Sequence, residues 1–114
     1  MREDIIETAG VKYAINRRWT VYKWSSPGNR GIHDRLHIKK SVVFSIEYKA
    51  TGKKASPKQR AEAVKLKAAG IPCRCFDNVQ DARDFINIMT EIAGSDSPIL
   101  DMAVLSNDIR SFDP

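Results

Sequence analysis

The chain has 114 residues, of which 42% are hydrophobic and 29% are charged. This size and balance predict one globular domain with a buried core and leave no room for a separate regulatory domain. No stretch approaches the roughly 18 apolar residues that a membrane helix needs, and the first residues lack the apolar run of a signal peptide. We therefore expect a cytoplasmic protein without a membrane partner.

The charge is unevenly distributed along the chain. Residues 12–74 contain 16 lysines and arginines against three acids, a local net charge of +13. Residues 75–114 have a net charge of −6 and residues 1–11 a net charge of −2, which together leave the overall value of +5. A basic middle between acidic ends predicts a surface that binds a polyanion such as nucleic acid. The alternative is a solvated basic surface that only keeps the protein soluble.

The first half of the chain predicts one helix and three strands. A helix is expected over 2–15, with Ile5, Ala9 and Tyr13 as its apolar stripe and Gly10 as a weak point. β-Branched and aromatic residues predict a strand over 19–24, in which Trp19 and Trp24 are interpreted as core or interface residues. Turn residues predict a loop over 25–31. Two strands over 33–39 and 41–49 are close enough in sequence to form a hairpin.

The second half predicts two helices separated by a short strand. For a helix over 56–70, Ser56 is the expected N-cap, Pro57 the first residue and Gly70 the stop. A strand follows over 71–76, and its two cysteines, at positions 73 and 75, are interpreted as reduced structural thiols. Asn78 caps the last helix, whose apolar face comprises Val79, Ala82, Phe85, Ile86 and Met89.

The order αβββαβα predicts an α/β fold with a central mixed sheet flanked by helices. The domain is expected to cover residues 1–94. The mixed signals of residues 95–114 predict a packed extension or a partly disordered tail.

The strand SVVFSIEYK, residues 41–49, has the strongest chemical pattern. With a period of two, Val42, Phe44, Ile46 and Tyr48 share one face, whereas Val43, Ser45, Glu47 and Lys49 share the other. Asp34, near the start of the preceding strand, is brought close to Glu47 by a hairpin. Two carboxylates held together favour either protonation or a bound cation, for which Mg²⁺ or Mn²⁺ is suited. A nearby lysine can orient or activate the attacking water, or stabilise charge on a phosphate.

The segments SPGNRGIHD (26–34) and IEYKATGKKASPKQ (46–59) resemble motifs of the virus-type replication-repair nuclease (VRR-NUC) domain. That domain is a branch of the PD-(D/E)xK nuclease superfamily, and the resemblance spans roughly residues 3–90. The family pattern has a helix glutamate, a Ser-Pro-Gly loop leading to Gly-x-Pro-Asp, then Glu-x-Lys, and a glutamine on the next helix. His33 stands where the family has proline, a position that shapes the backbone rather than supplying a ligand.

The resemblance implies a nuclease fold and a set of functional residues. Asp34, Glu47, Lys49 and Gln59 match catalytic positions, and Glu7, Asp34 and Glu47 match metal ligands for Mg²⁺ or Mn²⁺, with Glu3 as second choice on the helix. No organic cofactor is implied. The resemblance further implies cleavage of branched DNA, such as four-way (Holliday) junctions, by a homodimer. The expected DNA-binding residues flank this site in loops or in the first helical turn: Arg30, Lys53, Lys54, Lys58 and Arg60.

Several residues have a simpler interpretation beside the functional one. Ser56 and Gln59 form a capping box, which explains the glutamine without catalysis. Glu7 is also an acid suited to the first turns of a helix, where it complements the helix dipole. His33 and His37 share a strand face, but without further ligands they are interpreted as solvent-exposed or hydrogen-bonded histidines rather than a zinc site. For the whole protein, the alternative is a non-catalytic nucleic-acid-binding module of the same fold.

Overall fold

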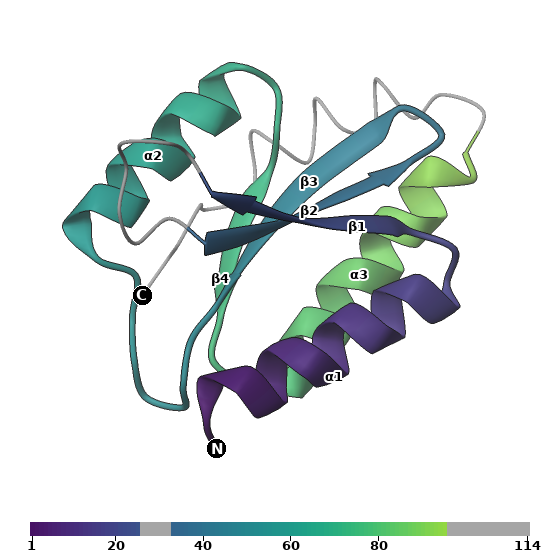
Figure 1. The fold of residues 1–114 in the computed structure, drawn as a ribbon. Coiled ribbons are helices and arrows are strands. Elements are labelled where there is room, and N and C mark those ends of the chain that lie inside the picture. Colours follow the sequence, from purple (N-terminus) through teal and green to yellow (C-terminus); the bar gives the residue numbers. More distant parts are fainter. Residues whose placement is uncertain (26–32, 96–114) are drawn as a thin grey trace.

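The computed structural model describes residues 1–25 and 33–95, apart from the side chains of Ser25, His33 and Asp34. Most of the loop predicted over 25–31 and of the tail predicted over 95–114 lies outside the described residues. Within the described part, helices and strands follow one another in the predicted order αβββαβα (Figure 1). They are α1 (Glu3–Asn16), β1 (Thr20–Ser25), β2 (His33–Lys39), β3 (Val42–Tyr48), α2 (Pro57–Ala68), β4 (Cys73–Phe76) and α3 (Val79–Ala93).

The four strands form one mixed sheet in the order β1-β2-β3-β4. The pairs β1–β2 and β2–β3 are antiparallel, whereas β3 and β4 are parallel and are connected through α2. The predicted hairpin joins β2 to β3 through Lys40 and Ser41, which both have positive φ angles of 48° and 69°. Two such residues between strands form the tight turn whose twist matches that of the sheet. The fold class predicted from the sequence is therefore confirmed.

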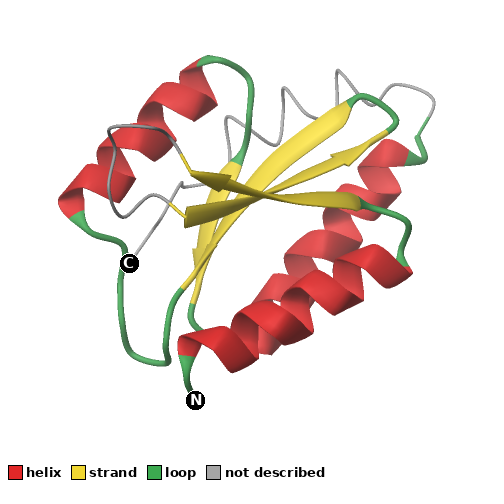
Figure 2. Ribbon diagram, viewed as in Figure 1, coloured by secondary structure: helices red, strands yellow, loops and turns green. Residues whose placement is uncertain are grey.

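Helices cover both faces of the sheet (Figure 2). Helices α1 and α3 lie side by side on one face, and α2 lies on the other (Figure 1). The predicted inward face of β3 packs under α1 and α3, where Phe44, Ile46 and Tyr48 are buried beside Ile86 and Met89. Trp19 belongs to the same core, and its indole nitrogen donates a hydrogen bond of 2.9 Å to the Thr90 hydroxyl. No helix in the described part of the chain is long and apolar enough to cross a membrane.

The buried stripe of α1 differs from the predicted one by a single position. Ile6, Gly10 and Ala14 are buried, whereas Ile5 is 45% exposed. The expected stripe of Ile5, Ala9 and Tyr13 was therefore wrong. The physical reason is the close approach of Tyr48, whose ring lies against the Cα of Gly10: a Cβ there would come within 2.2 Å of the phenol oxygen. The glycine that weakens the isolated helix is the residue that lets the helix pack.

Helix α2 is attached to the sheet by a much smaller apolar cluster. Its only buried residues are Gln59 and Ala63, and Ala63 packs with Ala55 and Cys73. The cap predicted at Ser56 is present, and Gly70 ends the helix region with a φ of 92°. Helix α2 is thus held mainly at its beginning and along one narrow line.

His37 is buried in the core instead of being exposed, because β2 presents it to Phe44. The two rings stack with centroids 4.3 Å apart and planes only 9° from parallel. Burial, which disfavours the charged imidazolium, lowers the pKa of His37 from 6.5 to about 4, and the Arg35 charge lowers it further. Backbone groups of Arg35 and Phe44 offset part of this effect. The histidine is therefore neutral in the folded protein at neutral pH.

This buried histidine predicts a loss of stability in weak acid. The folded pKa of about 4 lies below the unfolded value of 6.5, so the unfolded chain binds more protons between these values. The His37 contribution to the free energy of unfolding is intact above about pH 6.5 and should fall by about 2 kcal/mol at about pH 5. Urea unfolding of wild type and of His37→Phe, which keeps a stacked ring, measures this term. Equal pH dependence in the two proteins would exclude it.

Candidate active site

Glu47 is a buried carboxylate near the end of β3. Its side chain is 4% exposed, although it lies on the sheet face opposite the main core. Alternation along the strand places it on the same side as Ser45, and parallel pairing places it next to Cys75 of β4. Burying a charge is unfavourable unless it is paired and hydrogen-bonded. The contacts of Glu47 therefore indicate what this position is built to hold.

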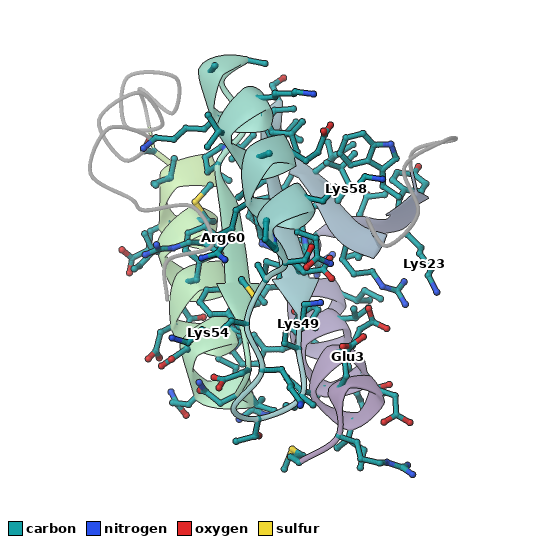
Figure 3. All side chains as sticks on the ribbon, turned by 90° about the vertical axis from the view of Figure 1, so that its left-hand side faces the viewer. Glu3, Lys23, Lys49, Lys54, Lys58 and Arg60 are labelled. Carbon is teal, nitrogen blue, oxygen red and sulfur yellow. The ribbon has the colours of Figure 1, made fainter. Side chains whose placement is uncertain are left out.

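Two side chains contact the same oxygen of Glu47. The Gln59 amide nitrogen donates a hydrogen bond of 2.8 Å to Oε1, and the Lys49 ammonium lies 3.6 Å from Oε1. Lys49 extends the line of β3, since its backbone N–H donates to the Phe76 carbonyl at 2.9 Å. The side chain of Lys49 is 19% exposed, so the lysine connects the buried carboxylate to the surface. In Figure 3 it lies just below the beginning of α2.

Gln59 caps α2 and also contacts Glu47, whereas a catalytic role for it stays a prediction. Its carbonyl oxygen accepts a hydrogen bond of 2.8 Å from the Ser56 backbone N–H, and its own backbone N–H donates to the Ser56 hydroxyl at 3.1 Å. This is a complete capping box. Because the cap occupies the oxygen end of the amide, the nitrogen end faces Glu47. The helix cap therefore orients the side chain that holds the carboxylate.

Asp34 occupies a backbone position adjacent to Glu47. Arg35 pairs with Ile46 in the antiparallel ladder, so the preceding residue of β2 falls beside the following residue of β3. The side chain of Asp34 is outside the described part of the structure, and its role as a metal ligand stays a prediction. The hairpin does bring the two backbone positions together, as the sequence suggested.

Glu7 contacts a residue that sequence reasoning did not consider. Nη2 of Arg35 donates a hydrogen bond of 3.3 Å to one carboxylate oxygen of Glu7, and Nε of Arg35 lies 3.3 Å from the other oxygen in an ion pair. Both side chains are about one-fifth exposed. Since Arg35 pairs with Ile46, its side chain lies on the α1 and α3 face of the sheet, opposite that of Glu47. The described contacts bring Glu47, Lys49 and Gln59 together and hold Glu7 on the other face.

A divalent cation is compatible with the donors at the end of β3. Glu47 supplies a fixed carboxylate, and the backbone position of Asp34 is adjacent, which matches the oxygen ligands that Mg²⁺ and Mn²⁺ prefer. Among the side chains that the structure describes, no group of three His, Cys, Asp or Glu residues forms a complete metal site. A ligand set based on Glu47 therefore needs at least one contribution from outside those side chains, from water or from a substrate phosphate.

Cys75 lies beside Glu47 but does not provide a reactive thiolate. Burial, together with the nearby Glu47 charge, raises the pKa of its thiol to about 11. Both cysteines of β4 are thiols rather than a disulfide within the described part of the chain, as predicted. At neutral pH the sulfur is protonated, so nucleophilic catalysis by Cys75 does not fit the site.

Exposed cations surround the beginning of α2. Lys58 and Arg60 lie on either side of its first turn, and Lys54 lies on the approach to it (Figure 3). Lys23 of β1 is exposed as well, but it pairs with Arg35 and so belongs to the α1 and α3 face of the sheet. Lys53 is also exposed in the loop before α2. Arg30, the remaining predicted cation, lies outside the described residues. The described members of the predicted set thus share one side of the molecule with Lys49.

The loop after Lys49 is anchored by residues that the sequence analysis did not select. The Asp77 carboxylate accepts a hydrogen bond of 2.9 Å from the Gly52 backbone N–H, which lowers the pKa of Asp77. Thr51 accepts from the Met1 ammonium and donates to the Asp77 carbonyl. Gly52 has a φ of 85°, which favours glycine. The Thr51-Gly52 pair in the sequence indicates a turn, but it does not indicate that Asp77 holds this turn.

The fold and the site together define an α/β protein with a buried glutamate–lysine pair on the basic side of a mixed sheet. No family model matches the chain. Over 71 residues, 61% of this chain and 76% of the relative, it is 38% identical to a protein of Acyrthosiphon pisum secondary endosymbiont phage 1 named "Putative nuclease p44". At this identity and coverage, the chain belongs to the same nuclease family as that phage protein.

Proposed function

We propose that this protein is a metal-dependent, structure-selective DNA endonuclease of the VRR-NUC type, which hydrolyses phosphodiester bonds in branched DNA such as four-way (Holliday) junctions. The observation that carries the proposal is the pairing of buried Glu47 with Lys49 and Gln59, beside a face of exposed cations. Membership of a phage nuclease family supports the same class of reaction. Such an enzyme would act in the cytoplasm of the bacterium or of the infected cell.

The residues at the end of β3 have distinct tasks in the proposed reaction. Glu47 and Asp34 would hold Mg²⁺ or Mn²⁺. The family resemblance adds Glu7, or Glu3, as a third ligand, and Glu7 would have to leave Arg35, with which it pairs on the other face of the sheet, to reach the ion. The ion, when bound, polarises the phosphate and lowers the pKa of a water molecule. Lys49 stabilises negative charge that develops on the phosphate and orients the attacking water. Gln59 keeps the Glu47 carboxylate in one orientation, which limits the reorganisation needed during reaction.

The surrounding cations would hold the DNA by its phosphates. Exposed lysines and arginines contribute most of the sequence-independent affinity for DNA and make it dependent on salt. Arg30, Lys53, Lys54, Lys58 and Arg60 are proposed for this role. A homodimer would present two active sites related by a two-fold axis, which suits paired cuts in a symmetric four-way junction.

A substrate panel tests this proposal against a purely binding role. Purified protein is incubated with linear duplex, single-stranded, flapped and four-way DNA, with Mg²⁺ or Mn²⁺ present or chelated. We expect metal-dependent cleavage that is fastest on the four-way junction. Cleavage of the linear duplex at the same rate would contradict the structural selectivity. Tight binding of DNA without cleavage under every condition would support the non-catalytic module instead.

The double role of Gln59 predicts that two changes at the same helix cap have different effects on catalysis. Ser56→Ala removes one cap hydrogen bond and should cost about 1 kcal/mol of stability with activity largely retained. Gln59→Ala removes the other cap hydrogen bond, from the Ser56 backbone N–H, together with the bond to Glu47, so we expect a similar loss of stability and a decrease in kcat of about 100-fold. Unfolding curves and single-turnover cleavage rates of the two variants make the comparison. Equal kcat values would reduce Gln59 to a helix cap.

A further inference from the structure

Helix α2 combines weak packing with a strongly basic surface. Of its residues only Gln59 and Ala63 are buried, and most of the others face solvent. The helix contains four basic residues and one acid, Glu62. Such a helix contributes little to the core, because its apolar contacts with the sheet are few. Packing against the sheet therefore does not explain why the exposed residues of this helix are mostly basic.

The two helices on the opposite side of the sheet do not have this excess of cations. Helices α1 and α3 together contain six acids and two basic residues, Lys12 and Arg83. The fold places α2 and the loop before it, which are rich in cations, on one side of the sheet and the two acidic helices on the other (Figures 1 and 3). On the α1 and α3 side the acids are balanced in part by Arg17, Arg35, Lys39 and Arg74, which lie outside the two helices but contact them or the core beneath them. A polyanion is therefore attracted more strongly to the α2 side.

The four cations of α2 form two pairs, and the two members of each pair are seven residues apart, which is nearly two helical turns. Lys65 follows Lys58 on one side of the helix, and Lys67 follows Arg60 on the other. Seven residues correspond to about 10 Å along a helix axis. The phosphates of one strand of B-DNA advance about 3.4 Å each along the duplex axis, so the two members of a pair are spaced like phosphates about three nucleotides apart.

We propose that the exposed face of α2 is a docking surface for the sugar-phosphate backbone of duplex DNA. The beginning of α2 lies at the scissile phosphate near Lys49, and the strand continues along the helix so that Lys65 contacts a phosphate about three nucleotides away. This orientation predicts that the protein needs at least this much duplex on one side of the cut. The inference rests on the proposed function in taking a DNA phosphate as the occupant and in placing the scissile phosphate near Lys49.

Glu62 lies within this surface and gives the docking surface a second test. Its carboxylate is 3.7 Å from the Lys65 ammonium, and the Lys65 side chain is 76% exposed. The Glu62 side chain is only 20% exposed, but the lysine end of the pair faces solvent. The pair is therefore weak and does not prevent Lys65 from contacting a phosphate. Removing the carboxylate frees the lysine and deletes a repulsive charge, so Glu62→Gln should bind DNA about threefold more tightly.

Binding measurements in EDTA test the docking surface without relying on cleavage. The probe is a fluorescently labelled duplex of roughly 20 base pairs, longer than α2 itself. Lys65→Ala should weaken binding about tenfold at low salt and reduce the slope of log K against log salt by about 1. Lys12→Ala is the matched control, since it removes an exposed helical lysine from the opposite side of the sheet and should leave both quantities unchanged.

Three outcomes would overturn the proposal. The first is equal weakening by Lys65→Ala and Lys12→Ala, which would indicate a diffuse effect of net charge. The second is wild-type affinity of the Lys65→Ala protein, and the third is weaker rather than tighter binding by Glu62→Gln. A protein that binds as proposed but never cleaves DNA would contradict the proposed function and leave the docking surface intact, so the two failures are distinguishable.

Discussion

Replacing Glu47 with glutamine is expected to lower the rate of DNA cleavage by at least about 1000-fold. The change removes the negative charge but keeps the shape of a side chain that is only 4% exposed. The Gln59 amide can still donate to the new carbonyl oxygen, so the local structure should persist. Lys49 loses its ionic partner, and the cation expected at this position loses a ligand. Single-turnover cleavage of a labelled four-way junction measures the effect.

The control for Glu47→Gln is a variant in which another glutamate, on a different surface of the protein, is replaced by glutamine. Glu91→Gln, on the exposed side of α3, should cleave at the wild-type rate. DNA binding by Glu47→Gln should be unchanged or tighter, because a carboxylate facing phosphate is removed. If Glu47→Gln retained activity within about tenfold of wild type, Glu47 would not be the central ligand of the site.

Replacing Gly10 with alanine is expected to destabilise the protein by about 3 kcal/mol. Glycine to alanine normally stabilises the interior of a helix by about 1 kcal/mol, so the predicted effect has the opposite sign. The added methyl group would lie 2.2 Å from the phenol oxygen of Tyr48, a side chain that is 2% exposed and has no space to retreat. The free energy of unfolding in urea measures the change.

Two companion variants show whether the close approach to Tyr48 causes the loss. Thr8→Ala changes an exposed position of the same helix and should be neutral or slightly stabilising. The double variant Gly10→Ala with Tyr48→Leu should be less destabilised than the two single changes together, because leucine vacates the space that the methyl group needs. If the losses of unfolding free energy in the two single variants simply added in the double variant, contact with Tyr48 would not be the cause of the Gly10→Ala effect.

Local signals were sufficient to predict the order of helices and strands. Alternation along β3 placed Phe44 and Tyr48 on the buried side and Glu47 on the other, and the structure confirms that division. The caps of α2 and α3 were visible because their hydrogen bonds join residues three apart in the sequence. Such features depend only on residues that are close in sequence, so they can be predicted before the fold is known.

Features that depend on contacts distant in sequence were less predictable. The stripe of α1 was displaced by one residue because Gly10 is selected by Tyr48, which lies 38 positions later. The ion pair between Glu7 and Arg35 joins two elements across the sheet, and neither residue type identifies the other. Gln59 shows the limit most clearly. Its cap could be predicted locally, whereas its bond to Glu47 required the helix to be placed on the sheet.

The most direct test of the central claim is the metal dependence of cleavage by wild type and by Lys49→Ala on the same four-way junction. We predict that wild type cleaves with Mg²⁺, stops in EDTA and recovers when Mg²⁺ is restored, and that Lys49→Ala binds the junction but cleaves it at least about 1000-fold more slowly. Cleavage by wild type that continues unchanged in EDTA would contradict metal dependence, and full activity of Lys49→Ala would contradict the role of Lys49 in cleavage.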